Sequence, residues 1–142
     1  MGTFFSATQV LDHLYLGSLE DAEELSRANP LAITTVISLC HEPVGRRAPG
    51  VCYLQFPVRD ARPISIAWLN AILCALEESL PLGAVLIHCG AGMSRAPTVV
   101  AAYLDRIGFL GFARALSYLE DLRPVVAPAK ALVESIEREL TN

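Results

Sequence analysis

The sequence predicts an α/β domain in which helices flank a small, mostly parallel central sheet and helical segments fill the C-terminal third. Two runs, 33–39 and 84–87, are apolar or β-branched almost throughout, as strands buried on both faces of a parallel sheet are. Segments with helical spacing alternate with the strands, and only helical segments follow residue 95. A chain of 142 residues suits one domain, so we expect residues 1–142 to form a single unit.

Hydrophobic runs bounded by turn residues define the strands. The expected strands cover residues 10–11, 14–16, 33–39, 51–58 and 84–87. Asp12 and His13 form a turn between the first two strands. The segment 41–50 is rich in proline, glycine and arginine, and we expect it to be a surface loop before the fourth strand. That strand leads into a charged loop, 59–63, which ends in proline.

Spacing near 3.6 residues and capping residues define the helices. The expected helices cover residues 19–28, 65–80, 96–106, 111–122 and 127–140. Ser18 caps the first helix, Asp21 completes a weak capping box, and Asn29–Pro30 stops the helix. Apolar positions recur along the second helix with the helical period, and Pro81–Gly83 ends it. Arg123–Pro124 separates the last two helices.

The composition is apolar enough to raise the question of a membrane protein. Hydrophobic residues make up 53% of the chain and charged residues 18%, and the mean hydropathy is +0.42. The longest stretch without a charged side chain, 79–94, is shorter than the roughly 20 residues of a spanning helix and contains His88. No basic residue precedes the apolar part of residues 1–12, which argues against a secretory signal. We therefore expect no transmembrane segment. Trp68 and Phe109 could pack in the core or form an apolar surface, and we favour the core.

Charge and cysteine usage argue against a nucleic-acid-binding protein and against a metal-binding protein. Fifteen acidic residues outnumber eleven basic ones, and no basic run is longer than Arg46–Arg47, so we expect no nucleic-acid partner. None of the four cysteines has C-x-x-C spacing and the three histidines are scattered, so we expect neither a metal site nor a cofactor. Cys52 and Cys74 are expected in the core. Free cysteines without a secretory signal indicate a cytoplasmic, reducing location.

The segment 85–97 carries the residues suited to chemistry. A buried strand ends at His88, small residues follow, and Pro97 stands in the first turn of a helix, where its missing N–H is tolerated. This order directs several backbone N–H groups and the positive end of the helix dipole at one point, which forms a phosphate-sized anion site. We call residues 89–95 the phosphate loop. Its predicted phosphate-binding residues are Gly90, Ala91, Gly92, Met93, Ser94 and Arg95.

Cys89 begins the phosphate loop and is the candidate nucleophile. The N–H groups and the helix dipole favour its thiolate, which would attack a bound phosphate in line. Arg95 closes the loop, and its planar guanidinium suits two phosphate oxygens. His88 is expected to orient the loop and to support the thiolate. The leaving oxygen needs a proton, which a carboxyl group on a loop after a strand could supply. Asp60 follows a predicted strand and fits this role, as general acid in the first step and as general base toward water in the second.

The motif HCGAGMSR, residues 88–95, resembles the signature of the cysteine-dependent protein tyrosine phosphatase superfamily. The chain length, the loop and the helix after it are similar to those of the small, atypical dual-specificity phosphatases. Leu14–Gly17 resembles the opening strand of that family, Phe56–Asp60 its general-acid loop, and Leu122–Pro124 its turn between late helices. The likeness therefore extends over most of the chain.

The resemblance implies a protein phosphatase that acts on phosphotyrosine, and also on phosphoserine or phosphothreonine, through a phosphocysteine intermediate without a metal. It assigns the catalytic roles to Cys89, Arg95 and Asp60, and it implies a phosphoprotein substrate as the partner. Some family members use a second cysteine to trap the oxidised nucleophile as a reversible disulfide, so Cys40 is a candidate redox partner of Cys89. The alternative for Cys40 is a core cysteine at a strand end.

The sequence departs from the family pattern at two places. Family members usually carry Ser or Thr after the loop arginine, where the hydroxyl steadies the departing cysteine sulfur, but this chain has Ala96. We therefore expect slow hydrolysis of the phosphoenzyme. The C-terminal helix lacks the Asn and Gln of the family's closing motif, so no functional role is assigned to it.

Several alternatives stay open. The same chemistry could act on a phosphoinositide or another phosphorylated metabolite, although the neutral side chains of the phosphate loop favour a phosphoprotein. A module that binds phosphate but turns over poorly is supported only by Ala96. A sulfur-transfer loop is disfavoured, because such loops have a different spacing between cysteine and arginine. An arsenate-reducing loop is disfavoured, because proteins of that kind carry the loop near the N-terminus. Four arginines form either a basic rim that attracts phosphate or ordinary solvated charge: Arg46, Arg47, Arg59 and Arg62.

Overall fold

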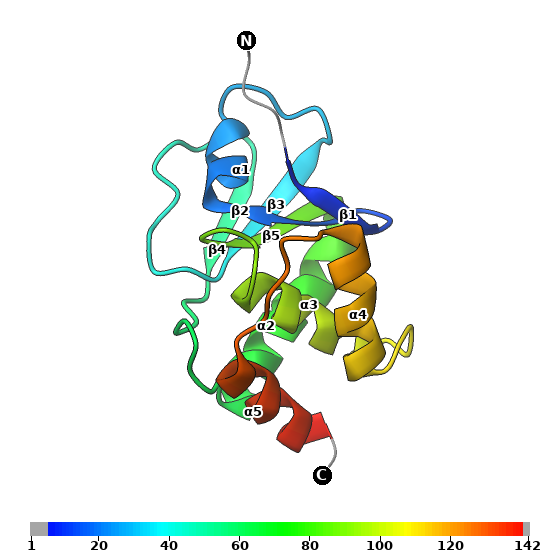
Figure 1. Cartoon of the computed structure of the whole chain (residues 1–142). Helices are drawn as coiled ribbons and strands as arrows, with labels where there is room; N and C mark the ends of the chain where they lie inside the picture. Colours follow the sequence, from blue (N-terminus) through cyan, green and yellow to red (C-terminus); the bar gives the residue numbers. More distant parts are fainter. Residues whose placement is uncertain (1–5, 141–142) are drawn as a thin grey trace.

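The computed structural model describes residues 6–140 and confirms the predicted α/β architecture (Figure 1). A five-stranded sheet has the order β1-β2-β5-β3-β4; β1 pairs antiparallel with β2, and the other neighbours pair in parallel. The strands are β1 (Thr8–Leu11), β2 (Leu14–Ser18), β3 (Ile33–Ser38), β4 (Cys52–Gln55) and β5 (Ala84–Cys89). The helices are α1 (Leu19–Glu24), α2 (Ile66–Ser79), α3 (Arg95–Arg106), α4 (Phe112–Leu122) and α5 (Lys130–Leu140), with a 3-10 turn at Leu80–Leu82.

Residues 1–5, which belong to the stretch considered above for a secretory signal, lie outside the described residues. Within residues 6–140, every helix is too short or too polar to span a membrane. The same part of the chain contains no cluster of three or more His, Cys, Asp or Glu side chains that is suited to a metal ion.

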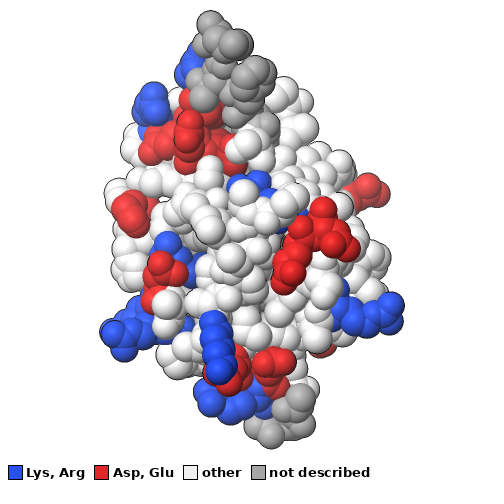
Figure 2. All heavy atoms as spheres, in the orientation of Figure 1, with Lys and Arg blue, Asp and Glu red and all other residues white. Residues whose placement is uncertain are grey.

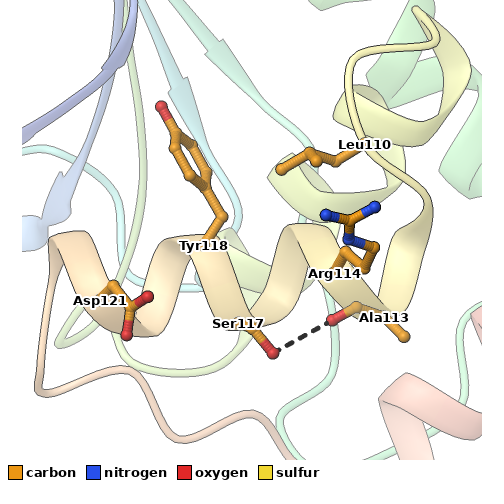
Figure 3. Close-up of a pocket in the computed structure, with 6 residues that line it drawn as sticks. All are labelled: Leu110, Ala113, Arg114, Ser117, Tyr118 and Asp121. Atoms are coloured by element: carbon orange, nitrogen blue, oxygen red, sulfur yellow. Dashed lines mark hydrogen bonds between the residues drawn. The ribbon is translucent and has the colours of Figure 1, made fainter.

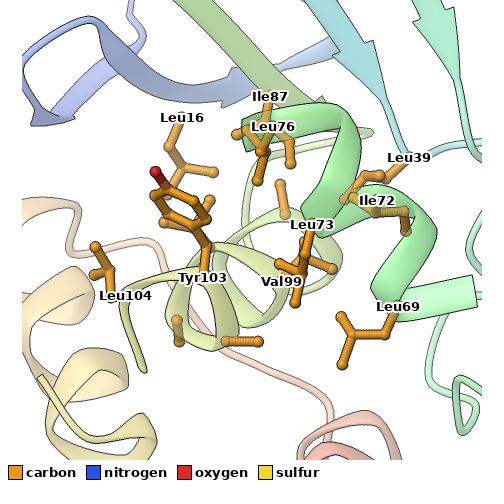
Figure 4. Close-up of a cluster of buried hydrophobic side chains, with 14 of the residues drawn as sticks. Leu16, Leu39, Leu69, Ile72, Leu73, Leu76, Ile87, Val99, Tyr103 and Leu104 are labelled. Carbon is orange, nitrogen blue, oxygen red and sulfur yellow. The ribbon is translucent and has the colours of Figure 1, made fainter. Parts of the chain in front are cut away.

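The sheet separates two hydrophobic layers. Helix α1 packs on one face, and α2 to α5 lie beyond the other face, in the lower half of Figure 1. Alternation along the central strand β5 sends Val85 and Ile87 into the larger layer and Ala84 and Leu86 into the smaller one. Figure 4 shows the larger layer, where aliphatic side chains of α2 and α3 meet those of the sheet. All six residues of β5 are buried, as the apolar run predicted.

The carboxyl ends of the four parallel strands meet at one edge of the sheet. The register places Ser18 of β2 opposite Cys89 of β5, and Ser38 of β3 opposite His88. The segments that follow β3, β4 and β5 therefore leave the sheet at the same edge, where open α/β sheets generally bind ligands. The segment after β3 carries Cys40, the segment after β4 carries Asp60, and the segment after β5 is the phosphate loop.

The predicted cap of the first helix is confirmed. The Ser18 hydroxyl accepts from the Asp21 N–H at 3.2 Å, and the Asp21 carboxylate accepts from the Ser18 N–H at 2.9 Å. The helix ends at Glu24 instead of near Ala28, because the chain turns over residues 25–27 before it enters β3. The last helix likewise starts later than predicted, since residues 127–129 are used in contacts with the phosphate loop.

Several side chains predicted to lie in the core are exposed. Cys52 lies on the edge strand β4 and Cys74 on the outer side of α2. Phe109 is 47% exposed and packs edge-on against Tyr118, with ring centroids 5.5 Å apart. An edge strand and the solvent face of a helix leave an apolar side chain in water even where the residue type favours burial.

Trp68 is also exposed, by 39%, and it supports the loop that follows β4. Its indole N–H donates to the Pro57 carbonyl at 2.8 Å, and its ring packs edge-on against Phe56 at 5.7 Å between centroids. The indole needs this hydrogen bond and therefore stays at the surface. The N-terminal end of α2 is thus fastened to the segment that carries Asp60.

A buried histidine joins the two central strands. His88 has no exposed surface, and its Nδ1 lies 3.0 Å from the Cys89 carbonyl oxygen, which can only accept. Nδ1 therefore carries the proton, and Nε2 accepts from the Ser38 hydroxyl at 2.6 Å. Burial lowers the pKa of His88 below its usual value of 6.5, and the hydrogen bond to the Cys89 carbonyl only partly opposes this effect. A neutral imidazole thus ties β3 to β5 immediately before the phosphate loop.

We expect the free energy of unfolding to fall as the pH is lowered from 7 to 5.5. The unfolded chain binds a proton at His88 near pH 6.5, whereas the folded protein binds it only at lower pH, so acid favours the unfolded state. This residue contributes at most about 1.4 kcal/mol per pH unit below 6.5. Urea denaturation at several pH values should show a shallower pH dependence for His88→Asn than for the wild type. Parallel curves for the two proteins would contradict the neutral, buried state of His88.

Candidate active site

The phosphate loop connects the end of β5 to the start of α3 and packs against β2. Its chain turns at Gly92, whose φ of +70° lies in the left-handed region that favours glycine. A Cβ at this position would lie 2.6 Å from the carbonyl oxygen of Gly17 in β2. A larger residue at 92 would therefore push the loop away from the sheet.

Donors from outside hold the carbonyl groups of the loop outward. The Gly90 carbonyl accepts from the Leu19 N–H at 2.9 Å, at the start of α1. The Met93 carbonyl accepts from the Ala127 N–H at 2.7 Å, in the segment before α5. The two carbonyls between them accept from the guanidinium of Arg123. Four consecutive carbonyls are thus fixed by three different parts of the chain.

The outward carbonyls determine where the N–H groups point. In a trans peptide the C=O of one residue and the N–H of the next point in opposite directions, so the N–H groups of residues 91–94 point inward. Among the described residues, none accepts a hydrogen bond from these four N–H groups. Inward donors at the N-terminus of α3, a 12-residue helix, form a site for an anion.

Cys89 and Arg95 lie at the two ends of this ring of donors. Cys89 is only 2% exposed, and the Ala96 N–H donates to its sulfur at 3.4 Å. The Arg95 Nη1 donates to the Val58 carbonyl at 3.2 Å, and its Nε lies 3.9 Å from the Asp60 carboxylate. The structure therefore brings the predicted nucleophile, anion-binding arginine and carboxylic acid together.

Asp60 stands at the entrance of the site. Its side chain is 70% exposed, in contrast to the buried sulfur of Cys89. A pocket of about 200 Å³ is lined by Asp60, Cys89, Ala91, Met93, Ser94, Arg95 and Ala127. Arg95 is the sole cationic side chain in this lining. A carboxyl group at the mouth and a thiol at the floor are the two groups needed on opposite sides of a phosphate ester.

Ser94 contributes to the site through its backbone. Its hydroxyl accepts from the Ala129 N–H at 2.8 Å, and this contact ties the loop to the segment before α5. Its carbonyl accepts from the Thr98 N–H in the first turn of α3, at 3.1 Å. The hydroxyl is thus used for support, and the N–H of Ser94 is the group directed at the pocket.

A larger hollow, of about 570 Å³, lies against α4 (Figure 3). Arg114 and Asp121 lie near its two ends, and the Tyr118 hydroxyl donates to the Val10 carbonyl of β1 at 2.8 Å. This tyrosine covers the outer edge of the sheet, since β1 is an edge strand. The lining contains no cysteine, histidine or converging set of backbone donors, so the smaller pocket at Cys89 is the candidate active site.

Cys40, the candidate redox partner, lies beyond the end of β3 and is fully buried. Its thiol donates to the Glu42 carbonyl at 3.4 Å. Burial raises the pKa of the Cys40 thiol; Glu42 and Cys89 raise it further, whereas Arg95 lowers it. The Leu39 N–H, one residue before Cys40, donates at 2.9 Å to the carbonyl of His88, one residue before Cys89, so the two cysteines follow paired positions of β3 and β5, although they are not bonded to each other.

The four arginines considered as a basic rim divide into two pairs. Arg46 forms an ion pair with Glu23 at 3.5 Å, and Arg47 lies over the ring of Tyr53 at 5.0 Å, so both stabilise the loop 41–50. Arg59 and Arg62 are exposed on either side of Asp60 and remain candidates for attracting phosphate. On the face shown in Figure 2, acidic and basic side chains are interspersed around a broad uncharged area.

Two residues that hold the site in place through hydrogen bonds were missed by the sequence analysis. Arg123 was noted only as part of a turn, and Ser38 only as part of a strand. Arg123 contacts a loop about 30 residues earlier, and nothing near it in the sequence indicates that contact. Ser38 and His88 lie near the carboxyl ends of two predicted parallel strands. If these strands pair side by side, the two residues lie opposite each other, and this placement could have suggested their contact.

Comparisons with known proteins agree with this geometry. Residues 14–139 match the family described as dual specificity phosphatase, catalytic domain. Human dual specificity protein phosphatase 15 is 33% identical over 133 residues, which cover 90% of this chain and 44% of that protein. Human dual specificity phosphatase 28 is 35% identical over 125 residues, which cover 84% of this chain and 69% of that protein. The chain thus spans less than half the length of the first of these relatives.

Solved structures are similar over nearly the whole chain. A crystal structure of human DUSP28 has a TM-score of 0.80 at 30% identity and covers 92% of this chain and 93% of that one. The structure of a mouse putative dual specificity phosphatase complexed with zinc tungstate has a TM-score of 0.84 at 27% identity. The match covers 97% of this chain and 88% of that one. The matched residues, the fold and the relatives together show that the chain belongs to the dual specificity phosphatase catalytic-domain family, within the cysteine-based protein tyrosine phosphatase superfamily.

Proposed function

We propose that the protein is a phosphatase that hydrolyses phosphotyrosine and phosphoserine or phosphothreonine monoesters of protein substrates through a phosphocysteine intermediate. The observation that carries this proposal is the inward orientation of the loop N–H groups around the Cys89 sulfur, with Asp60 at the mouth of the same pocket. The four cysteines are free thiols, and we propose that the protein works in the reducing cytoplasm.

In the first step the Cys89 thiolate attacks phosphorus, so that an S–P bond forms and the ester P–O bond breaks. The loop N–H groups and the Arg95 guanidinium hold the three non-bridging oxygens as charge shifts among them. The leaving oxygen takes its proton from the Asp60 carboxyl group. The exposed position of Asp60 supports this role, because the leaving group departs toward the mouth of the pocket.

In the second step water attacks the phosphocysteine, the S–P bond breaks, and inorganic phosphate forms. Asp60, now a carboxylate, accepts the proton of the attacking water, and the sulfur leaves as a thiolate. The Ala96 N–H at 3.4 Å is directed at the sulfur and stabilises it in both steps. His88 is neutral and buried, so its proposed role is to fix the position of the loop and not to transfer protons.

The lining of the pocket supports a phosphoprotein over a highly anionic lipid head group or metabolite. Ala91, Met93 and Ala127 contribute no charge, and Arg95 is the sole cation among the lining residues. A head group with several phosphates would bring more negative charge than one arginine and four N–H groups compensate.

Substitution of the proposed nucleophile and acid should separate their roles. Cys89→Ser should abolish release of phosphate from phosphopeptides, because the hydroxyl is not ionised at neutral pH. Asp60→Asn should lower kcat/KM by about 10²- to 10⁴-fold. The measurement is a panel of phosphotyrosine, phosphoserine and phosphothreonine peptides and phosphoinositide vesicles.

Matched controls are Cys52→Ser, an exposed cysteine on β4, and Asp12→Asn, an exposed acid in the β1–β2 turn at the opposite end of the sheet. Both controls should retain wild-type rates. Activity that survives in Cys89→Ser would reject the mechanism, and faster turnover of phosphoinositides than of peptides would reject the substrate class.

Ala96 favours a second candidate function, a module that binds phosphoprotein and turns over slowly. Its side chain is fully buried beside the Cys89 sulfur and has no hydroxyl to donate to the leaving thiolate. If only the backbone N–H stabilises the sulfur, the phosphoenzyme should accumulate.

Rapid-mixing kinetics with p-nitrophenyl phosphate should show a burst of nitrophenol followed by a slower steady rate. Ala96→Ser should raise the steady rate by about tenfold, which is what one added hydrogen bond to a charged group is worth. The burst rate should stay within about twofold of the wild-type value. Ala101→Ser makes the same change about one and a half turns further along α3 and should alter neither phase. Equal steady rates in wild type and Ala96→Ser would refute the proposed role of this position.

We also propose that Cys40 protects Cys89 from irreversible oxidation. Peroxide oxidises the Cys89 thiolate to a sulfenic acid and is itself reduced to water. The Cys40 thiol then attacks that sulfur, a disulfide forms, and a second water leaves. The position of Cys40 supports this pairing, because it is buried and follows Leu39, whose N–H donates to the carbonyl of His88 directly before Cys89.

Peroxide treatment should yield a Cys40–Cys89 disulfide by peptide mass spectrometry, and dithiothreitol should restore activity. Cys40→Ser should instead lose activity irreversibly. Cys52 and Cys74, which are exposed, serve as internal controls for nonspecific oxidation. Irreversible oxidation of Cys89 in the wild type without the disulfide would contradict the proposed protection by Cys40.

A further inference from the structure

Arg123 lies behind the phosphate loop and is 9% exposed. Its Nε donates to the Gly92 carbonyl at 3.1 Å, and its Nη2 lies 3.4 Å from the Ala91 carbonyl. Its Nη1 donates in another direction, to the Ser6 carbonyl at 2.9 Å and the Thr8 hydroxyl at 3.1 Å. One planar guanidinium therefore joins the phosphate loop to the segment at the start of β1.

The far side of this bridge is itself fixed. The N–H and hydroxyl of Ser6 both donate to Asp21, at 2.9 and 2.8 Å, and Asp21 is only 1% exposed. The same carboxylate accepts from the Ser18 N–H at the N-terminus of α1. The Ser6 side of the Arg123 bridge is therefore held by contacts that do not involve the phosphate loop.

The charge of Arg123 has no carboxylate partner within ion-pair distance among residues 6–140. A buried charge without a counterion is costly, and here neutral oxygens from four residues partly compensate it. The guanidinium donates to two carbonyls of the phosphate loop, so an anion held by the loop would lie close to this charge, although the side chain does not line the pocket.

We propose that Arg123 is a positioning residue for the phosphate loop. By holding the carbonyls of Ala91 and Gly92 outward, it turns the N–H groups of Gly92 and Met93 toward the phosphate. It thus controls the middle two of the four inward donors, while Leu19 and Ala127 control the outer two. The proposal rests on the proposed function, because it names what orients the anion site of that function.

The geometry requires arginine and not simply a positive charge. The acceptors lie on two sides of the guanidinium, and a planar group with several fixed N–H donors reaches both sides at once. A lysine ammonium at this place would keep the charge but would lose one set of contacts. Arg123→Lys and Arg123→Met therefore separate the bridging role from the charge.

The test measures tungstate affinity by calorimetry and, in parallel, kcat and KM for p-nitrophenyl phosphate. Arg123→Met should weaken tungstate binding by about 10- to 100-fold, as expected for the loss of two charge-assisted contacts that orient donors. Arg123→Lys should recover less than half of that loss on a logarithmic scale. Thr8→Val removes one contact on the far side and should weaken binding by about two- to fivefold.

Arg106→Met is the matched control, because Arg106 at the end of α3 contacts Asn70 and Glu77 on the protein surface and not the loop. It should leave tungstate affinity unchanged. A folded Arg123→Met protein with affinity and kcat/KM within twofold of wild type would overturn the proposal. If Arg123→Met fails to fold, wild-type affinity in both Arg123→Lys and Thr8→Val would overturn it instead.

The tungstate readout does not depend on turnover. Wild-type protein that binds tungstate but releases no phosphate from any substrate would contradict the proposed function while the comparison of Arg123 variants still decides the positioning role. Wild-type protein that does not bind tungstate would overturn both.

Discussion

The orientation of four consecutive peptide planes in the phosphate loop is the constraint on which the site depends. The four carbonyls from Gly90 to Met93 are held outward by donors from three parts of the fold: the start of α1, the side chain of Arg123 and the segment before α5. Because peptide planarity couples each carbonyl to the next N–H, these contacts within the fold orient the donors of the proposed anion site.

The parallel sheet supplies the remaining geometry. The thiol, the carboxylic acid and the second cysteine come from segments far apart in the sequence, but each follows a parallel strand and so reaches the same edge. The neutral His88 ties two of these strands together directly before the proposed nucleophile, Cys89. Trp68 fastens the segment that carries the proposed acid, Asp60. Contacts that hold the sheet together and side chains proposed for the chemistry thus lie at the same edge.

Much of this arrangement could be predicted from local sequence patterns. The run at 84–87 indicated a buried strand, and the glycines and arginine that follow Cys89 indicated an anion-binding turn, because these signals lie within a few residues of one another. Contacts between distant segments left no such signal. Arg123 was therefore interpreted as a turn residue, although its side chain donates to the Gly92 carbonyl. Trp68 was expected in the core, because its position in the sequence gives no sign that its indole N–H donates to the Pro57 carbonyl.

A crystal structure with tungstate bound tests the central claim most directly, because the oxyanion reports the direction of every donor in the loop. The account predicts one tungstate at the Cys89 sulfur, with its oxygens about 3 Å from the N–H groups of residues 91–94 and from the guanidinium of Arg95. The Ala91 and Gly92 carbonyls should still face Arg123. Tungstate bound elsewhere, or loop carbonyls that face the pocket, would contradict it.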